Sequence, residues 1–166
     1  GIEEFAMAFV VLQGGDAAEI APGDYTLSIA YSGKVQASDQ GLYVVSYTDR
    51  GQPQRMLATQ LEAVFARMLF PSFDEPAFRA VFDITVSAPA GYEVVSNMPL
   101  TRTEVSLGGA ATHRFAPTPP MPSYLVALTV GRFESLGGEA AGVPLRILTA
   151  AGKREQARYA LDVTQK

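Results

Sequence analysis

Alternation of apolar and polar positions runs through most of the chain and predicts β-strands. The clearest runs cover residues 25–31 and 78–87, where apolar side chains occupy nearly every second position and a strand would bury one face. Shorter strands, separated by Gly, Pro and Asn residues, are predicted at residues 5–12, 42–47, 56–61, 92–96, 102–107, 112–116, 124–130 and 145–149. Gly108-Gly109 and Gly137-Gly138 are interpreted as turns. The fold class indicated is mainly β, with a large curved antiparallel sheet or a sandwich.

Helical periodicity is confined to the end of the chain. Within residues 153–166 small and apolar side chains recur at the i, i+3, i+4 and i+7 positions of a helix, and Gly152 precedes them. No cap, Gly or Pro closes this helix, and the chain starts with Gly1 rather than Met. We therefore expect a part of a longer protein, in which residues 1–150 form a β-rich domain and residues 151–166 begin a helical passage toward another domain.

Composition and charge narrow the function classes. Of the 166 residues 48% are hydrophobic and 18% charged, which is typical of a packed globular chain. The net charge is -4 and the basic residues are scattered, so nucleic acid and anionic lipid are not expected partners. The apolar run at residues 5–12 is too short for a membrane span, which needs about 20 residues. It follows two acidic residues rather than a basic segment, so we interpret it as a buried strand. These features fit a cytoplasmic, a periplasmic or a secreted protein equally well.

Residue counts exclude several kinds of catalytic site in this chain. Cysteine is absent, and His113 is the single histidine, so an H-E-x-x-H zinc site cannot form. No glycine-rich phosphate-binding motif follows a strand. We interpret His113 as a solvent-facing strand residue rather than a catalytic one, and we assign no catalytic or metal-binding residue to the chain.

Gln60 and Glu62 are the candidate binding residues. If residues 56–61 form a strand, the two side chains point to the same side and place an amide beside a carboxylate. Such a pair can hold a cation with several donors, for example a substrate ammonium group. Spacing alone, however, favours an ordinary solvated strand face.

The segment that follows is interpreted as structural. Arg67 can pair with Asp74 and Glu75 to pin the loop, and Pro76 holds Glu75 in an extended conformation. We expect the neighbouring aromatic side chains to be core or interface residues rather than a ligand platform: Phe65, Phe70, Phe73 and Phe78.

This segment resembles the zinc aminopeptidase family that includes aminopeptidase N and alanyl aminopeptidase (gluzincin type). The motifs that carry the resemblance are Thr59-Gln60-Leu61-Glu62, Ala66-Arg67, Phe70-Pro71-Ser72-Phe73-Asp74-Glu75-Pro76, Arg79-Ala80 and Phe82. Others flank them in the same order: Pro22-Gly23-Asp24-Tyr25, Gly41-Leu42-Tyr43, Ser96-Asn97-Met98-Pro99, Met121-Pro122-Ser123-Tyr124-Leu125 and Gly131-Arg132-Phe133. The sequence departs from the family pattern at Ser72, where Cys is commoner, at Val64-Phe65 and at Pro122. None of these departures touches Gln60 or Glu62.

The resemblance implies a non-catalytic N-terminal domain, saddle-like and β-rich, of a zinc metallo-aminopeptidase. Glu62 matches the family residue that binds the free α-amino group of the substrate, and Gln60 matches a neighbour that lines the first side-chain pocket. The resemblance places zinc, and the removal of N-terminal residues, in a catalytic domain that this chain lacks. That domain and a peptide N-terminus are the implied partners, and no cofactor is expected in this chain.

Two other functions stay open. The first is a catalytically inactive scaffold of the same fold, which a parent lacking H-E-x-x-H would indicate; the second, weaker one is a free-standing carbohydrate-binding β-sandwich. Because the catalytic domain would normally cover the face around Gln60, Glu62 and residues 70–73, we expect that face to be unusually exposed in this chain.

Overall fold

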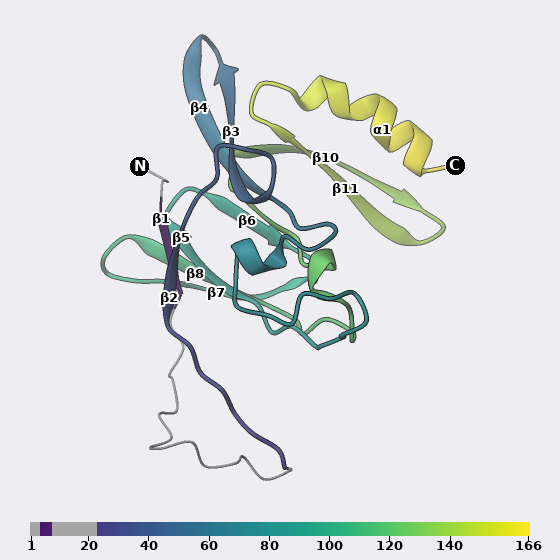
Figure 1. Cartoon of the computed structure of the whole chain (residues 1–166). Helices are drawn as coiled ribbons and strands as arrows, with labels where there is room; N and C mark the ends of the chain where they lie inside the picture. Colours follow the sequence, from purple (N-terminus) through teal and green to yellow (C-terminus); the bar gives the residue numbers. More distant parts are fainter. Residues whose placement is uncertain (1–3, 8–22) are drawn as a thin grey trace.

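The structure is a computed structural model that describes residues 4–7 and 23–166 (Figure 1). Strands dominate it, which confirms the mainly β fold class. The strands are β1 (Glu4–Met7), β2 (Tyr31–Lys34), β3 (Gly41–Asp49), β4 (Gln52–Gln60), β5 (Thr85–Pro89), β6 (Glu93–Ser96), β7 (Leu100–Val105), β8 (Ala110–Phe115), β9 (Leu128–Gly131), β10 (Phe133–Ala140) and β11 (Val143–Ala150). The helices are three short 3-10 turns, η1 (Ala66–Met68), η2 (Ser123–Leu125) and η3 (Arg154–Gln156), and the α-helix α1 (Ala157–Thr164).

The largest sheet has the antiparallel order β3-β4-β9-β6. Its hairpin β3–β4 turns at Arg50 and Gly51, both with positive φ (48° and 77°), as the tightest hairpin turns require. The predicted strands at residues 42–47 and 56–61 are confirmed with shifted ends, and each extends toward the other. The predicted strand at residues 92–96 corresponds to β6.

A second sheet has the order β5-β8-β7, and β8 lies at its centre. Its β7–β8 turn contains the predicted Gly108-Gly109, closed by hydrogen bonds between Ser106 and the segment Gly109 to Ala110. Strands predicted at residues 102–107 and 112–116 are confirmed with shifted ends. β1 pairs separately with β2.

The third group is the hairpin β10–β11, with α1 packed on it (Figure 1). The predicted strand at 145–149 and the terminal helix are confirmed, whereas β10 was not predicted and Gly137-Gly138 is not a turn. Both glycines lie inside β10, and the turn falls at Ala141 and Gly142. A Cβ on Gly138 would lie 2.8 Å from a Leu161 methyl group. The glycine therefore lets the helix approach the strand.

The prediction of a strand over residues 78–87 is wrong for its first seven residues, because β5 starts at Thr85. Residues 78–84 still run beside residues 115–121. Ala80 exchanges two backbone hydrogen bonds with Met121, and the amide of Phe82 donates to the Thr118 hydroxyl at 2.9 Å. The partner segment contains Pro117, Pro119 and Pro120, which have no N–H to donate. A continuous ladder cannot form against them.

Three further strand predictions need correction. Of residues 25–31 only Tyr31 lies in a strand, and Tyr25 and Leu27 are 63% and 65% exposed. Alternating apolar and polar residues do not suffice to form a strand there, because β1 offers a hydrogen-bonding partner only to residues 31–34. In the run 124–130 the strand starts at Leu128, because Ser123 to Leu125 form η2. Only part of the predicted strand 5–12 coincides with β1, and residues 8–12 lie outside the described residues.

His113 is buried rather than solvent-facing, with 8% of its surface exposed. Residues two apart share a strand face, and Ala111 and Phe115 on either side of it are also buried, whereas Arg114 is exposed. The predicted alternation is correct, but the face of the strand that carries His113 was expected to meet solvent and instead meets the core. The ring Nδ1 lies 3.4 Å from the Thr103 hydroxyl on the neighbouring strand.

The main core gathers side chains from both larger sheets and from the loops that connect them. Its buried members are Leu42, Leu57, Leu61, Ala66, Leu69, Ala88, Val94, Phe115, Met121, Val126 and Val130. Leu61 and Ala66 are among the most completely buried of these. The core therefore extends to the chain segment directly after β4, where the candidate residues lie.

Candidate functional site

Glu62 lies on an exposed turn that two buried residues hold in place. Leu61 before it and Ala66 after it are both in the core, and the amide of Phe65 donates to the carbonyl of Leu61 at 2.9 Å. This bond closes the turn over residues 62–64, and η1 follows directly. The hydrophobic anchors therefore fix the backbone while they leave the Glu62 carboxylate in solvent.

Gln60 is the last residue of β4 and is also exposed. Glu62 lies beyond the end of the strand, so the alternation argument that placed both side chains on one side does not extend to it. The structure brings the two residues within one short segment at the end of β4, with Leu61 turned inward between them.

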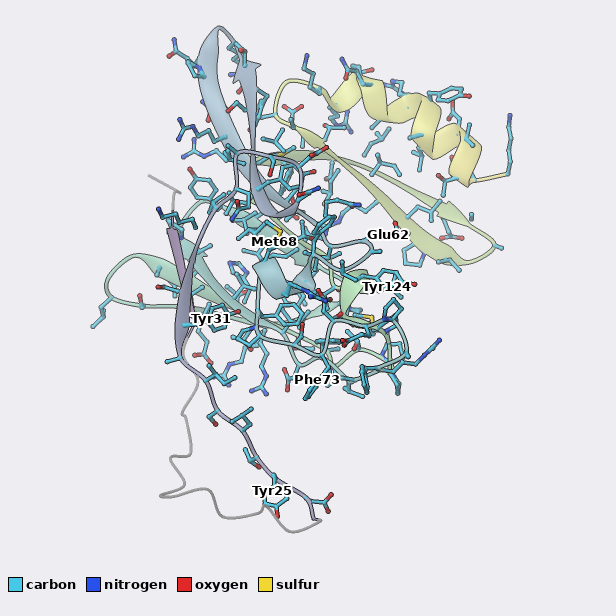
Figure 2. The ribbon with its side chains drawn as sticks, viewed as in Figure 1. Tyr25, Tyr31, Glu62, Met68, Phe73 and Tyr124 are labelled. Carbon is cyan, nitrogen blue, oxygen red and sulfur yellow. The ribbon has the colours of Figure 1, made fainter. Side chains whose placement is uncertain are left out.

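The segment before β9 leads into that strand beside the end of β4. β9 pairs antiparallel with β4 through Leu57–Val130 and Ala58–Thr129, and the amide of Leu128 donates to the Thr59 hydroxyl at 2.9 Å. Figure 2 labels Glu62 and, on η2, Tyr124.

Asn97 holds one end of that segment. Its side-chain amide donates to the carbonyl of Leu125 at 2.7 Å, and its side-chain oxygen accepts from the amide of Ala127 at 2.7 Å. The NH₂ group and the oxygen of one side chain are thus both hydrogen-bonded at the point where η2 leads into β9. The local sequence gave no sign of this role, because the bonds span 28 and 30 residues.

Asp74 fixes the other end of this segment, where η2 begins. It is 2% exposed, and its Oδ1 accepts from the Ser123 hydroxyl at 2.6 Å. Its Oδ2 accepts from both the backbone amide and the side-chain Nε of Arg67, each at 3.0 Å. Burial by itself raises the pKa of Asp74, but the hydrogen bonds from Ser123 and Arg67 outweigh burial and hold that pKa below its ordinary value.

The ion pairing that was predicted to fix this loop is confirmed for two of the three residues named. Arg67 and Asp74 form the ion pair, whereas Glu75 contributes its backbone carbonyl, which accepts from the amide of Phe78. Ser123 was missed as the third member of the cluster. Its only sequence signal was its place in a motif of the resembling family, because 49 residues separate it from Asp74.

An apolar groove opens next to the Asp74 cluster. Its volume is about 550 Å³, and it is lined mainly by residues 69–73 and 78–86. Phe73 is 81% exposed, and its ring contacts that of Phe78 with centroids 5.6 Å apart. Phe70 is half-buried and meets Phe82 edge-on. The expected exposure is confirmed for Gln60 and Glu62 and, within residues 70–73, for residues 71–73 but not for Phe70.

Comparison with known proteins identifies what this site belongs to. Residues 6–125 match the sequence profile of the Peptidase M1 N-terminal domain, a span that includes both Gln60 and Glu62. The chain belongs to this family.

Several M1 aminopeptidases are similar to the chain. It is 41% identical over 150 residues to aminopeptidase N of Acetobacter pasteurianus, covering 90% of this chain and 42% of that protein. It is 36% identical over 148 residues to the puromycin-sensitive aminopeptidase of Caenorhabditis elegans, covering 87% and 16%. It is 36% identical over 141 residues to probable aminopeptidase 1 of Saccharolobus solfataricus, covering 84% and 18%. The chain thus spans less than half the length of these relatives.

M1 aminopeptidases are zinc enzymes, but the residues of this M1 domain do not fit a zinc site. Over residues 4–7 and 23–166, no three His, Cys, Asp or Glu side chains gather as metal ligands. The buried carboxylate of Asp74 is already occupied by three donors. No chemical step through a metal is therefore assigned to this chain. Within the same described ranges, no helix has the length and apolar character that crossing a bilayer requires.

Proposed function

We propose that this chain is the non-catalytic, substrate-anchoring N-terminal domain of a zinc metallo-aminopeptidase. In this proposal the Glu62 carboxylate binds the free α-amino group of a peptide, and Gln60 lines the pocket for the first side chain. The observation that carries it is the Glu62 turn: an exposed carboxylate on a backbone fixed by Leu61 and Ala66, inside the segment that matches the M1 family.

The chemistry of an exopeptidase favours a carboxylate at this position. An N-terminal residue differs from an internal one by its ammonium group, and charge-assisted hydrogen bonds to that group supply both affinity and register. Such bonds contribute about 1.5–3 kcal/mol each. A rigid turn adds to this because little backbone freedom is lost on binding.

The partner of the domain is the catalytic domain of the same parent protein, which would hold zinc and supply the metal-activated water. The exposed apolar groove with Phe73 and Phe78 supports this partner, since exposed patches of this kind mark interaction surfaces. The greater length of the M1 relatives supports it as well.

The decisive experiment replaces Glu62 in the full-length parent enzyme. Glu62→Gln keeps the shape of the side chain and removes its charge, so KM for an aminoacyl-anilide should rise by about 10–100-fold. Glu104→Gln is the matched control, because Glu104 is an exposed carboxylate on β7 that pairs with Arg102. A KM for Glu62→Gln no higher than that of the control would refute the site assignment.

A second experiment separates the domain from the enzyme. The 166-residue chain alone, supplied with zinc, should not hydrolyse aminoacyl-anilides, and robust turnover would contradict its non-catalytic role. A parent sequence without H-E-x-x-H and its downstream glutamate would favour the inactive scaffold instead.

A further inference from the structure

Asp74 connects the chain segment that follows Glu62 with η2, the turn that precedes the neighbouring strand β9. On one side it accepts two hydrogen bonds from Arg67, in the η1 turn that follows the Glu62 turn after one residue. On the other side it accepts the hydroxyl of Ser123, the first residue of η2. The Glu62 turn and η2 are therefore joined through one buried carboxylate as well as through the β4–β9 pairing.

These contacts form a closed circuit around the site. From Glu62 the chain continues through η1 to Arg67, and the hydrogen bonds of Asp74 lead on to Ser123. η2 then leads into β9, which pairs back onto β4 just before Glu62. Asn97 fixes the point where η2 joins β9. A displacement of either segment would have to break a contact of this circuit.

The Glu62 side chain is exposed, so its placement depends on the backbone turn. The hydrophobic anchors Leu61 and Ala66 set the inner side of the turn. The bond from the Arg67 backbone amide to Asp74 sets its far end, because Arg67 directly follows Ala66.

We propose that Asp74 is a positioning residue for Glu62, which holds the Glu62 turn and η2 at a fixed separation so that a peptide ammonium meets the carboxylate in one geometry. This inference rests on the proposed function of Glu62. Asp74 does not touch the substrate; it acts through the Arg67 amide and the Ser123 hydroxyl.

The carboxylate matters because it serves three donors with two oxygens. An asparagine of the same shape has one oxygen, which can accept from both Arg67 donors, and an NH₂ group, which can only donate to the Ser123 hydroxyl oxygen. Asp74→Asn therefore keeps the volume of the side chain but removes its charge and reverses the Ser123 bond, which weakens both halves of the connection. Ser123→Ala removes only the η2 half and leaves the Arg67 pair intact.

The test is a double-mutant cycle in the full-length parent enzyme with an aminoacyl-anilide substrate. Asp74→Asn should raise KM by about three- to tenfold, and Ser123→Ala by about threefold, with kcat changed less than about twofold. In a Glu62→Gln background the effect of Asp74→Asn on KM should fall below about twofold, because the residue acts through Glu62. Equal effects of Asp74→Asn in both backgrounds would overturn the inference.

Glu104→Gln serves again as the matched control. It removes a carboxylate that pairs with Arg102 at 2.6 Å, but on an exposed part of β7 outside both the circuit and the apolar groove, so KM should stay unchanged. Thermal unfolding of each variant shows that it is folded at the assay temperature. If Asp74→Asn does not fold, Ser123→Ala decides the question, and an unchanged KM for it overturns the proposal.

The outcomes separate this inference from the proposed function. If Glu62→Gln raises KM while Asp74→Asn and Ser123→Ala do not, only the positioning role fails. If Glu62→Gln leaves KM unchanged, the anchoring role and the positioning role both fail.

Discussion

Gly131 at the end of β9 lies so close to Met56 on β4 that a Cβ added to the glycine would come within 2.7 Å of the Met56 Cβ. The same Cβ would lie 2.8 Å from the ring tip of Phe133. Two side chains therefore close around a position that only hydrogen can occupy. The glycine therefore permits the close approach of β4 and β9, on whose pairing the candidate site depends.

Gly131→Ala should consequently lower the free energy of unfolding by about 1–3 kcal/mol, because the crowded Cβ forces its neighbours apart. Urea unfolding of the 166-residue chain measures the change. Gly137→Ala is the control, since the nearest atom to its added Cβ is 3.8 Å away and its φ is not positive. That variant should be as stable as the wild type or slightly more so. Equal stability of the two variants would contradict the predicted crowding.

Leu61 provides a second test, of the core beneath the Glu62 turn. Its side chain is fully buried, so Leu61→Ala should cost about 2–5 kcal/mol of unfolding free energy. Leu107→Ala removes the same group from a fully exposed position in the β7–β8 turn and should change stability by less than about 0.5 kcal/mol. Chemical denaturation compares them, and a cost below about 1 kcal/mol for Leu61→Ala would show that the turn is not anchored in the core.

The buried carboxylate of Asp74 predicts a dependence of stability on pH. Although burial raises its pKa, the bonds from Ser123 and Arg67 bring the pKa below the ordinary value in the folded chain. A depressed folded pKa contributes stability above the unfolded pKa, which is about 3.9 for Asp, and this contribution is lost as pH falls through the folded pKa. The stability difference between wild type and Asp74→Asn should therefore be larger at about pH 6 than at about pH 2.5.

Denaturant unfolding of both proteins at several pH values measures that difference. Asp83→Asn serves as the control, because its carboxylate is exposed and its ion pair contributes little. A stability difference for Asp74→Asn that stays constant over this range would contradict the prediction.

Features that depend on neighbouring residues could be predicted from the sequence. The strands of the β3–β4 and β7–β8 hairpins and the turn at Gly108-Gly109 were predictable because alternation and turn residues lie within a few positions of one another. The same local pattern failed for residues 78–84, where prolines in the distant partner segment decide whether a ladder forms. It failed at Gly138 because the reason for that glycine is Leu161 of the helix.

The candidate site likewise contains some residues that the sequence could predict and others that it could not. Glu62 and Gln60 were found through family motifs, and the Arg67–Asp74 pair through their separation of seven residues. Ser123 and Asn97 reach their partners across 28 to 49 residues, a distance at which no periodicity signals contact. His113 shows the other limit, since alternation defines two strand faces but does not say which one is buried.

A final test asks whether Asn97 stabilises the chain through its two specific hydrogen bonds or acts only as an ordinary polar surface residue. It donates to the Leu125 carbonyl and accepts from the Ala127 amide, each at 2.7 Å, so Asn97→Ala should cost about 1 kcal/mol of unfolding free energy. Asn97→Asp keeps the acceptor for Ala127 but places a carboxylate oxygen against the Leu125 carbonyl oxygen. At neutral pH it should be no more stable than the alanine variant, and it should recover relative to it as pH falls and the carboxylate gains a proton. Urea unfolding at two pH values gives the ranking, and an aspartate variant as stable as the wild type at neutral pH would contradict the donor role of Asn97.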